Sequence, residues 1–166
     1  MGIFDFLKKG KGTNDSSRVN LDETEDIGIV THYKGKPFTG IGVTLHDNGE
    51  VFLEVPMIDG IKHGMGKEYR EDGSLDSEIE YKNDIPDGIW ISYYEGEPIF
   101  EKGKQKNMIQ EGAWEQIYRF ENGKETIISI TNYKSGKSIG KQIFFDRWSG
   151  EEIFHRAYDN NLFTSD

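Results

Sequence analysis

The chain has 166 residues, enough for one ordinary domain or one repeat array, and its 20 Lys and Arg against 30 Asp and Glu give a formal net charge of −10. Such a surface repels phosphate backbones and anionic lipids and attracts basic partners, so the charge argues against nucleic-acid binding. The chain contains no cysteine, which excludes a disulfide framework and a zinc–thiolate site.

The composition also bears on order. Only 34% of the residues are hydrophobic, which is low for a globular chain, yet 13% are aromatic and 20 are glycine. Disordered chains are poor in large aromatic residues. The sequence therefore predicts a thin, extended β structure with a shallow core.

The first 26 residues divide into two segments. Residues 1–9 (MGIFDFLKK) place apolar side chains on one face of two helical turns, which predicts a short helical plug that caps one end of the fold. Residues 10–26 are small, polar and acidic, which predicts a flexible linker.

The N-terminal segment has a second interpretation, as a weak interfacial anchor. In that case residues 1–11 would lie on a membrane with Lys8, Lys9 and Lys11 facing lipid headgroups, although the net negative charge of the chain opposes this. No apolar run reaches the roughly 18 residues that span a bilayer, and the start of the chain lacks the pattern of a secretory signal. We therefore expect a cytoplasmic protein.

Residues 27–33 resemble a first β-strand, and from Tyr33 onward the chain repeats. Each unit contains a pivot glycine, expected at a tight turn, and a second turn glycine. The pivots are Gly40, Gly64, Gly88, Gly112 and Gly140, and the second turns contain Gly49, Gly73, Gly96, Gly123 and Gly150. Five units, each of two short strands and two turns, fill an array over residues 27–160, with a tail at 161–166.

Alternation within the strands separates two faces. Odd positions after each pivot are mostly apolar, as in Ile41 and Val43, so we expect this face to be buried. Even positions mix polar side chains with large aromatic ones, and we expect this face to be exposed or covered by the terminal segments.

Two segments, 58–73 (IDGIKHGMGKEYREDG) and 81–96 (YKNDIPDGIWISYYEG), resemble the MORN-repeat family in its bacterial variant form. The likeness covers the repeat array and is looser in units four and five, where Gln105 stands in place of Tyr33 and Tyr81. The resemblance implies an all-β fold, an elongated and curved antiparallel sheet of successive β-hairpins. It also implies an antitoxin or immunity protein, as for bacterial members, or a scaffolding module, as for eukaryotic ones.

Little in the sequence indicates catalysis. The four histidines lie in different units without metal-ligand spacing, and the glycines occupy repeat turns rather than a phosphate-binding loop. We therefore expect no catalytic residues, no metal site and no cofactor.

Two features are candidates for partner binding. One is an acidic ladder in which each glutamate follows a second turn glycine by five residues: Glu54, Glu78 and Glu101. The other is an aromatic cluster at even positions: Trp90, Tyr94, Trp114, Tyr118 and Phe144. Exposed tryptophan and tyrosine are favoured anchors in protein interfaces. Alternatively, the glutamates form a solvated face, and the aromatic rings pack on each other or under the terminal segments. The apolar odd face needs cover in either case, by coiling of the sheet or by a second copy of the chain in a homodimer.

The expected function is that of a non-enzymatic binding protein that neutralises a cognate basic toxin by direct occlusion. Its acidic surface would steer the encounter, and the aromatic side chains would then be buried against the toxin. The alternative is a structural or scaffolding repeat module, associated with a membrane through its N-terminus.

Overall fold

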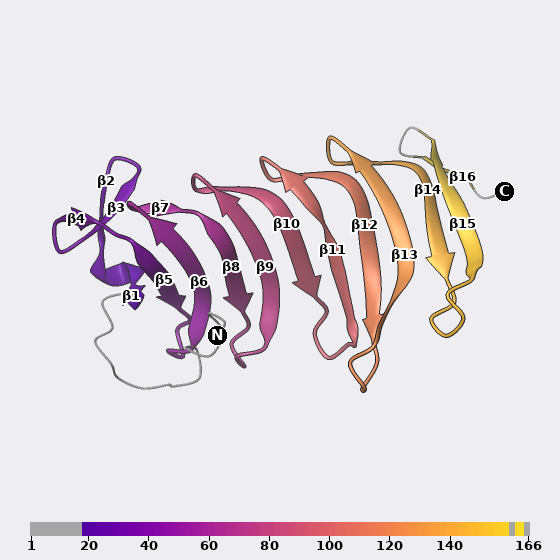
Figure 1. Ribbon diagram of the computed structural model, residues 1–166, viewed down its shortest axis with the longest axis horizontal. Helices are drawn as coiled ribbons and strands as arrows, with labels where there is room; N and C mark the ends of the chain where they lie inside the picture. The colour runs from indigo at the N-terminus through magenta and orange to yellow at the C-terminus, as the bar shows by residue number, and fades with distance from the viewer. Residues whose placement is uncertain (1–17, 160–161, 165–166) are drawn as a thin grey trace.

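The computed structural model describes residues 18–159 and 162–164, and side chains are described for residues 18–157. The fold is all-β. Thirteen of the described strands form one long sheet, and three short strands form a second sheet at its N-terminal end (Figure 1). The predicted fold class, a long sheet of successive antiparallel hairpins, is confirmed.

The long sheet follows the chain order, except that β7 pairs with β6 beside β8. Its strands are β1 (Arg18–Asn20), β5 (Gly40–Leu45), β6 (Val51–Ile58), β7 (Ile61–Lys62), β8 (Gly64–Tyr69), β9 (Leu75–Lys82), β10 (Ile85–Tyr93), β11 (Ile99–Lys106), β12 (Ile109–Arg119), β13 (Glu125–Lys134), β14 (Lys137–Phe145), β15 (Glu152–Asp159) and β16 (Leu162–Thr164). The second sheet contains β2 (Glu25–Ile27), β3 (Val30–Tyr33) and β4 (Lys36–Pro37). A single 3-10 turn, Leu21–Glu23, is the one helical element of the described residues. None of these residues forms a helix long and apolar enough to cross a membrane.

Tight turns link each hairpin to the next at one end of the strands. Both central residues of each turn have positive φ, as in type I′ turns: Lys34–Gly35, Asp59–Gly60, Asn83–Asp84, Asn107–Met108 and Ser135–Gly136. From Gly60 onward, the second central residue donates its backbone N–H to a carbonyl of the preceding hairpin, at 2.7–3.0 Å. These hydrogen bonds fix the stacking of successive units.

The pivot glycines do not lie in these turns, so that part of the prediction is wrong. Gly88, Gly112 and Gly140 lie inside β10, β12 and β14, with positive φ, and the strand register shifts around each of them. They occupy β-bulges, which bend a strand and leave a residue unpaired. The second turn glycines, from Gly49 to Gly150, do lie in turns with positive φ, as predicted.

The main hydrophobic core lies on the face of the even positions, so the prediction that the odd positions form the buried face is wrong. Directly paired residues share a face, and Gly42 lies opposite Val55, while Gly66 and Trp90 both lie opposite Ile79. We call this the tryptophan face. Its buried residues come largely from second strands of the hairpins: Leu53, Val55, Met57, Ile79 and Tyr81.

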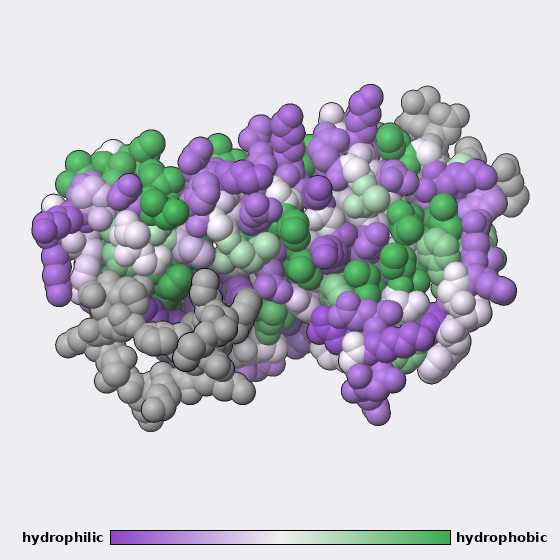
Figure 2. All heavy atoms as spheres, in the orientation of Figure 1, coloured by the Kyte–Doolittle hydropathy of each residue, from purple (hydrophilic) through white to green (hydrophobic). Residues whose placement is uncertain are grey.

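The glycines explain this reversal. A Cβ on Gly42 would lie 2.9 Å from the sulfur of Met57, and one on Gly66 would lie 2.9 Å from the ring of Tyr81. The missing side chains therefore make room for large ones from the next strand. The opposite face contains fewer buried residues, among them Val43 and Phe100. On the face that Figure 2 shows, polar and apolar side chains are interspersed.

The prediction of a flexible linker over 10–26 is wrong where the structure tests it. Residues 18–20 form β1, which pairs in parallel with β5, and Val19 is buried in the core. The side chain of Asn20 accepts a hydrogen bond from the backbone N–H of Asp22, at 3.1 Å, and so begins the 3-10 turn. The predicted helical plug, and the linker as far as residue 17, lie outside the described residues.

Two boundaries also differ. The strand predicted over 27–33 is divided by a turn at Gly28, with φ of +69°, into the end of β2 and all of β3. In the predicted C-terminal tail, residues 162–164 form β16, which pairs with β15.

Candidate functional site

The five residues of the predicted aromatic cluster lie on the tryptophan face. Cross-strand pairs connect them: Glu101 lies opposite Ser92 and Gln116, Gln116 lies opposite Ser129, and Ser129 lies opposite Phe144. Trp90, Trp114 and Tyr118 each lie two residues along a strand from one of these positions. The hydroxyl of Tyr94 accepts a hydrogen bond from Nε2 of Gln116, at 3.3 Å. The structure therefore brings the predicted residues together.

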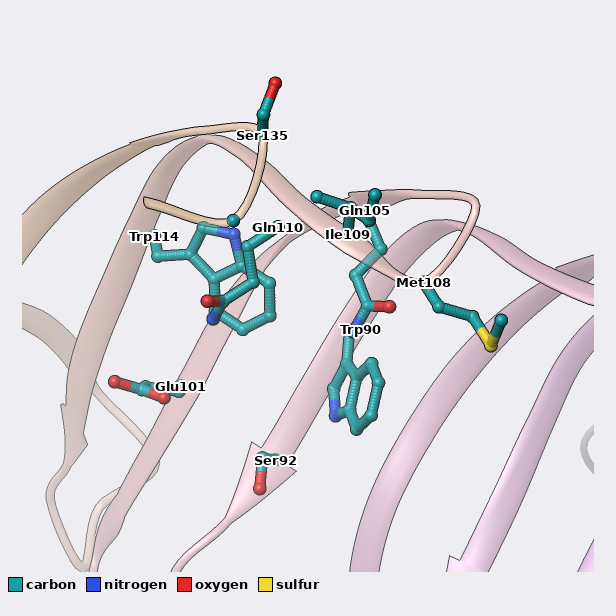
Figure 3. A pocket seen from close by; sticks show the side chains of 10 residues that line it. Trp90, Ser92, Glu101, Gln105, Met108, Ile109, Gln110, Trp114 and Ser135 are labelled. Atoms are coloured by element: carbon teal, nitrogen blue, oxygen red, sulfur yellow. The ribbon is translucent and has the colours of Figure 1, made fainter. Parts of the chain in front are cut away.

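Two of them form the walls of a cleft. Trp90 on β10 and Trp114 on β12 flank a space of about 550 Å³ that extends to the turn after β13 (Figure 3). Polar and apolar side chains complete its lining, including Ser92, Glu101, Gln105, Met108, Ile109 and Gln110. Clefts with mostly apolar walls and a few directed polar groups are the usual form of a binding site.

Both tryptophans are held firmly. Trp114 is 6% exposed, and its indole N–H donates to the backbone carbonyl of Lys104, at 3.2 Å. Its ring lies over Gly103 and makes an edge-to-face contact with Tyr133, with 6.1 Å between the ring centroids. Trp90 is partly buried and packs against the main core. Contacts within the protein therefore position both walls of the cleft.

A hydrogen-bond network holds the polar end of the cleft. Glu101 accepts a hydrogen bond from Nε2 of Gln116, at 3.2 Å. The other side-chain atom of that amide, Oε1, accepts one from the hydroxyl of Ser129, at 3.0 Å. The carboxylate of Glu101 is thus oriented by a buried serine through one intervening amide.

The predicted acidic ladder does not exist as such. Glu54 and Glu78 lie on the opposite face, directly across from Lys67, whereas Glu101 lies on the tryptophan face. The reason is the glycine from which the glutamates were counted. Gly96 follows its pivot Gly88 by eight residues, whereas Gly73 follows Gly64 by nine, so a count of five from Gly96 reaches the neighbouring position of the strand. A one-residue change in register moves a side chain to the other face.

The two glutamates on the opposite face already have partners. Glu54 forms an ion pair with Arg18 and accepts a hydrogen bond from the hydroxyl of Tyr69, at 3.3 Å. Glu78 lies 3.9 Å from Nζ of Lys67 and accepts one from the hydroxyl of Tyr93, at 2.7 Å. These contacts join neighbouring strands within the array. They give both carboxylates a structural role, and we no longer assign them to the binding site.

The same contacts change the acidity of the two tyrosines. Burial, with the charge and hydrogen bond of Glu54, raises the pKa of Tyr69 from 10.0 to about 12. Burial, with the hydrogen bond to Glu78, raises the pKa of Tyr93 to about 12. In each case the ionised phenol would face a neighbouring carboxylate, so the neutral form is favoured.

Replacing Tyr69 and Tyr93 together with phenylalanine should therefore flatten the alkaline part of the stability profile. In the unfolded chain both phenols ionise near pH 10.0, but in the folded chain only near pH 12. Between these values the unfolded state binds fewer protons, so the stabilisation is complete below pH 10 and is lost as the pH rises through about 12. The wild type should lose about 1 kcal/mol more per tyrosine than the double variant, after allowance for solvent screening.

Urea unfolding followed by circular dichroism across this pH range measures the difference. Because lysines also titrate there, the comparison of the two proteins is the result, and the profile of either alone is not. Parallel profiles for the two proteins would contradict the assignment of the Tyr–Glu contacts.

Sequence reasoning missed the polar lining of the cleft. The sequence marks Gln105 only as a residue that stands where other units have tyrosine, and not as part of a site. At the corresponding position of the third unit, Tyr81 fills the space above Gly66. At the same repeat position Gln105 places a carboxamide beside Trp90 instead (Figure 3). A polar residue replacing an aromatic one at a buried repeat position was the available signal.

Within the described part of the chain, no three His, Asp or Glu side chains lie close enough together to hold a metal ion. No protein-family model matches the chain, and no curated protein matches it.

Proposed function

We propose that the protein is a non-enzymatic binding module of the antitoxin or immunity type, which occludes a basic toxin with its tryptophan face. The observation that carries the proposal is the cleft between Trp90 and Trp114, in which Glu101 is the one charged residue among the described residues of the lining. Rigid indoles beside a single carboxylate favour a partner that offers cationic and apolar groups.

The charge of the whole chain supports the same partner. A net charge of −10 speeds the encounter with a basic protein and raises its local concentration at the surface. After the encounter, aromatic side chains supply most of the binding energy in a typical interface, especially when they lie at its centre. Tyr94, 43% exposed, and Tyr118 extend the aromatic surface beyond the cleft.

The resemblance of the hairpin units to the bacterial MORN variant supports an antitoxin or immunity role in particular. The proposal includes a cytoplasmic location, where such a protein would meet a toxin made in the same cell. It also includes the absence of catalysis: neutralisation would come from blocking the surface of the toxin, and no bond would be made or broken.

The test is neutralisation in cells. The reading frame beside the gene for this chain is expressed alone and together with the wild-type chain, and growth is measured. We expect the neighbouring product to be basic, to arrest growth alone, and to be neutralised through a direct complex. A neighbouring product that is harmless, or that arrests growth equally with and without the chain, would overturn the proposal.

Liposome flotation separates this function from the scaffolding alternative. A binding module of the proposed kind should stay with the soluble fraction when mixed with anionic vesicles, both as the full chain and without residues 1–11. Flotation of the full chain that is lost on this deletion would favour the membrane-associated scaffold instead.

A further inference from the structure

The cleft contains a polar group that the fold leaves unsatisfied. Gln105 is 7% exposed, and its Oε1 atom is buried with no hydrogen-bond partner in the described structure. Buried amide oxygens nearly always have a donor. Because Gln105 lines the cleft, a donor can come from a molecule bound there.

The other polar groups of the cleft also favour a donor with positive charge. Glu101 supplies a carboxylate, and the faces of aromatic rings attract cations. No lysine or arginine is present among the described residues of the lining. Lys102 and Lys104 belong to the same strand as Glu101, but they alternate to the opposite face, where Lys104 lines a second cavity that also reaches Gln105.

The spacing of the two acceptors limits what can satisfy both. Glu101 and Gln105 are four residues apart on β11, on the same face, which places their Cα atoms roughly 13 Å apart at the usual rise of a strand. Gly103 lies between them, and the ring of Trp114 covers it. One guanidinium group is too small to reach both acceptors, whereas an extended chain with two donor groups can reach them across the indole.

We propose that the cleft binds an extended basic segment of the partner protein, with an arginine side chain at Glu101 against the indole of Trp90, the more exposed of the two tryptophans, and a second donor side chain at Gln105. This inference rests on the proposed function, since it names the part of the partner that the same site recognises. Arginine suits the first position because its planar guanidinium stacks on an aromatic ring while it donates to a carboxylate, and because it is more weakly hydrated than lysine.

The binding test uses tryptophan emission from the full chain. The chain has 3 tryptophans, so a Trp148→Phe variant leaves only the two in the cleft. Trp148 is 69% exposed and lies outside the lining of the cleft. The probe is the peptide acetyl-Arg-Gly-Ser-Gly-Arg-amide, whose two arginines have the same four-residue spacing as the acceptors.

We expect a saturable change in emission with this peptide and none with the same peptide carrying citrulline, which has the shape of arginine without its charge. A lysine version should bind more weakly. Spermine tests whether the natural ligand is a small polyamine and not a protein segment. Binding of spermine as tight as that of the arginine peptide, or tighter, would overturn the assignment to a partner segment. Absence of a saturable change with the arginine peptide at about 10 mM would overturn the proposed site itself.

Variants locate the binding. Glu101→Gln and Gln105→Met should each weaken the peptide about tenfold, the effect of removing one charge-assisted hydrogen bond. Glu115→Gln is the matched control, because Glu115 lies on the neighbouring strand opposite Lys102 and so on the other face. Equal effects of Glu101→Gln and Glu115→Gln would show general electrostatic attraction and would contradict the site.

The same variants separate this inference from the proposed function. Wild-type chain that neutralises the neighbouring toxin, with Glu101→Gln and Gln105→Met neutralising it equally well, would overturn the inference and leave the function standing. A wild-type chain that gives no neutralisation, but binds the arginine peptide in a manner that depends on Glu101, would overturn the function and leave the cleft as a site for basic segments.

Discussion

Replacing Gly60 with alanine should destabilise the protein by about 3 kcal/mol or more, because two separate penalties coincide there. Gly60 lies in the turn between β6 and β7 with φ of +80°, a conformation that alanine adopts only with strain. An added Cβ would also lie 2.5 Å from the carbonyl oxygen of Thr31 and 2.8 Å from its nitrogen. These are backbone atoms of β3, so no rotation of a side chain can relieve the clash.

The contact that would be disturbed joins the two sheets. The N–H of Thr31 donates to the carbonyl of Gly60, at 3.0 Å, and the N–H of Gly60 donates to the carbonyl of Phe38, at 2.7 Å. Phe38 is 4% exposed and belongs to the main core. Moving β3 away to admit a methyl group would therefore break these hydrogen bonds and open one end of the core.

Gly73→Ala is the matched control. Gly73 has φ of +81°, yet a Cβ there would have no atom within 4 Å. It should cost about 1 kcal/mol, the strain of the left-handed conformation alone. Urea unfolding followed by circular dichroism measures both variants, and the difference between them isolates the contact with β3. Equal losses in the two variants would show that the small sheet contributes little to stability.

Much of the fold could be predicted because local rules govern it. Asn-Gly and Asp-Gly pairs at Gly49, Gly73 and Gly123 mark turns whichever neighbours they have, and the structure has turns there. The inter-hairpin turns were misplaced because the repeats were aligned on glycines. Two of these turns have no glycine at their centre, and Asn83, Asp84 and Met108 adopt the positive φ there instead. The aligned glycines occupy bulges, a role that depends on pairing with a neighbouring strand.

The choice of buried face could not be made from alternation alone. At Gly42 and Gly66 the buried face has no side chain, and the volume is filled by Met57 and Tyr81 from the following strands. The register between paired strands decides which side chain fills which gap. Alternation within a single strand gives no information about this register. Glu101 was placed on the wrong face for a different reason: it was counted from Gly96, which lies one residue closer to its pivot than Gly49 and Gly73 lie to theirs.

The site was predicted in part for a related reason. Trp90 and Trp114 were identified because large aromatic residues at polar positions are unusual in any repeat. Gln105 was not assigned to the site, because its meaning depends on Gly103 and Trp114, which lie beside it only after the strands pair. The cleft therefore depends on complementary residues in neighbouring strands: the ring of Trp114 on β12 occupies the space left by the missing side chain of Gly103 on β11.

Replacing the residues at positions 103 and 114 with those of the second hairpin should preserve the packing between the strands but remove the cleft. Gly103→Ala alone should cost about 2–3 kcal/mol, because its Cβ would lie 2.2–2.4 Å from ring atoms of Trp114. Trp114→Gly alone should cost about 3–5 kcal/mol for the lost burial of the ring. The φ of Gly103 is not in the left-handed region, so the clash with the ring, and not backbone strain, limits what this position accepts.

The informative variant combines Gly103→Ile with Trp114→Gly. It copies the second hairpin, where Ile79 lies between Gly66 on one side and Trp90 on the other. The new isoleucine would likewise lie between a glycine and Trp90, which already pairs with position 103. In a double-mutant cycle measured by urea unfolding, we expect the pair to be more stable than the sum of the two single changes by about 2 kcal/mol.

This double variant also separates folding from binding. It should keep the circular dichroism spectrum of the wild type but lose the response to the arginine peptide, because the ring between Glu101 and Gln105 is gone. If the losses of unfolding free energy from Gly103→Ile and Trp114→Gly simply add, the two positions do not compensate each other. Trp114 would then be needed mainly to hold β11 and β12 together. Coupled effects with lost peptide binding would mean that the scaffold accepts either arrangement, and that the tryptophan is required at this position for what the cleft binds.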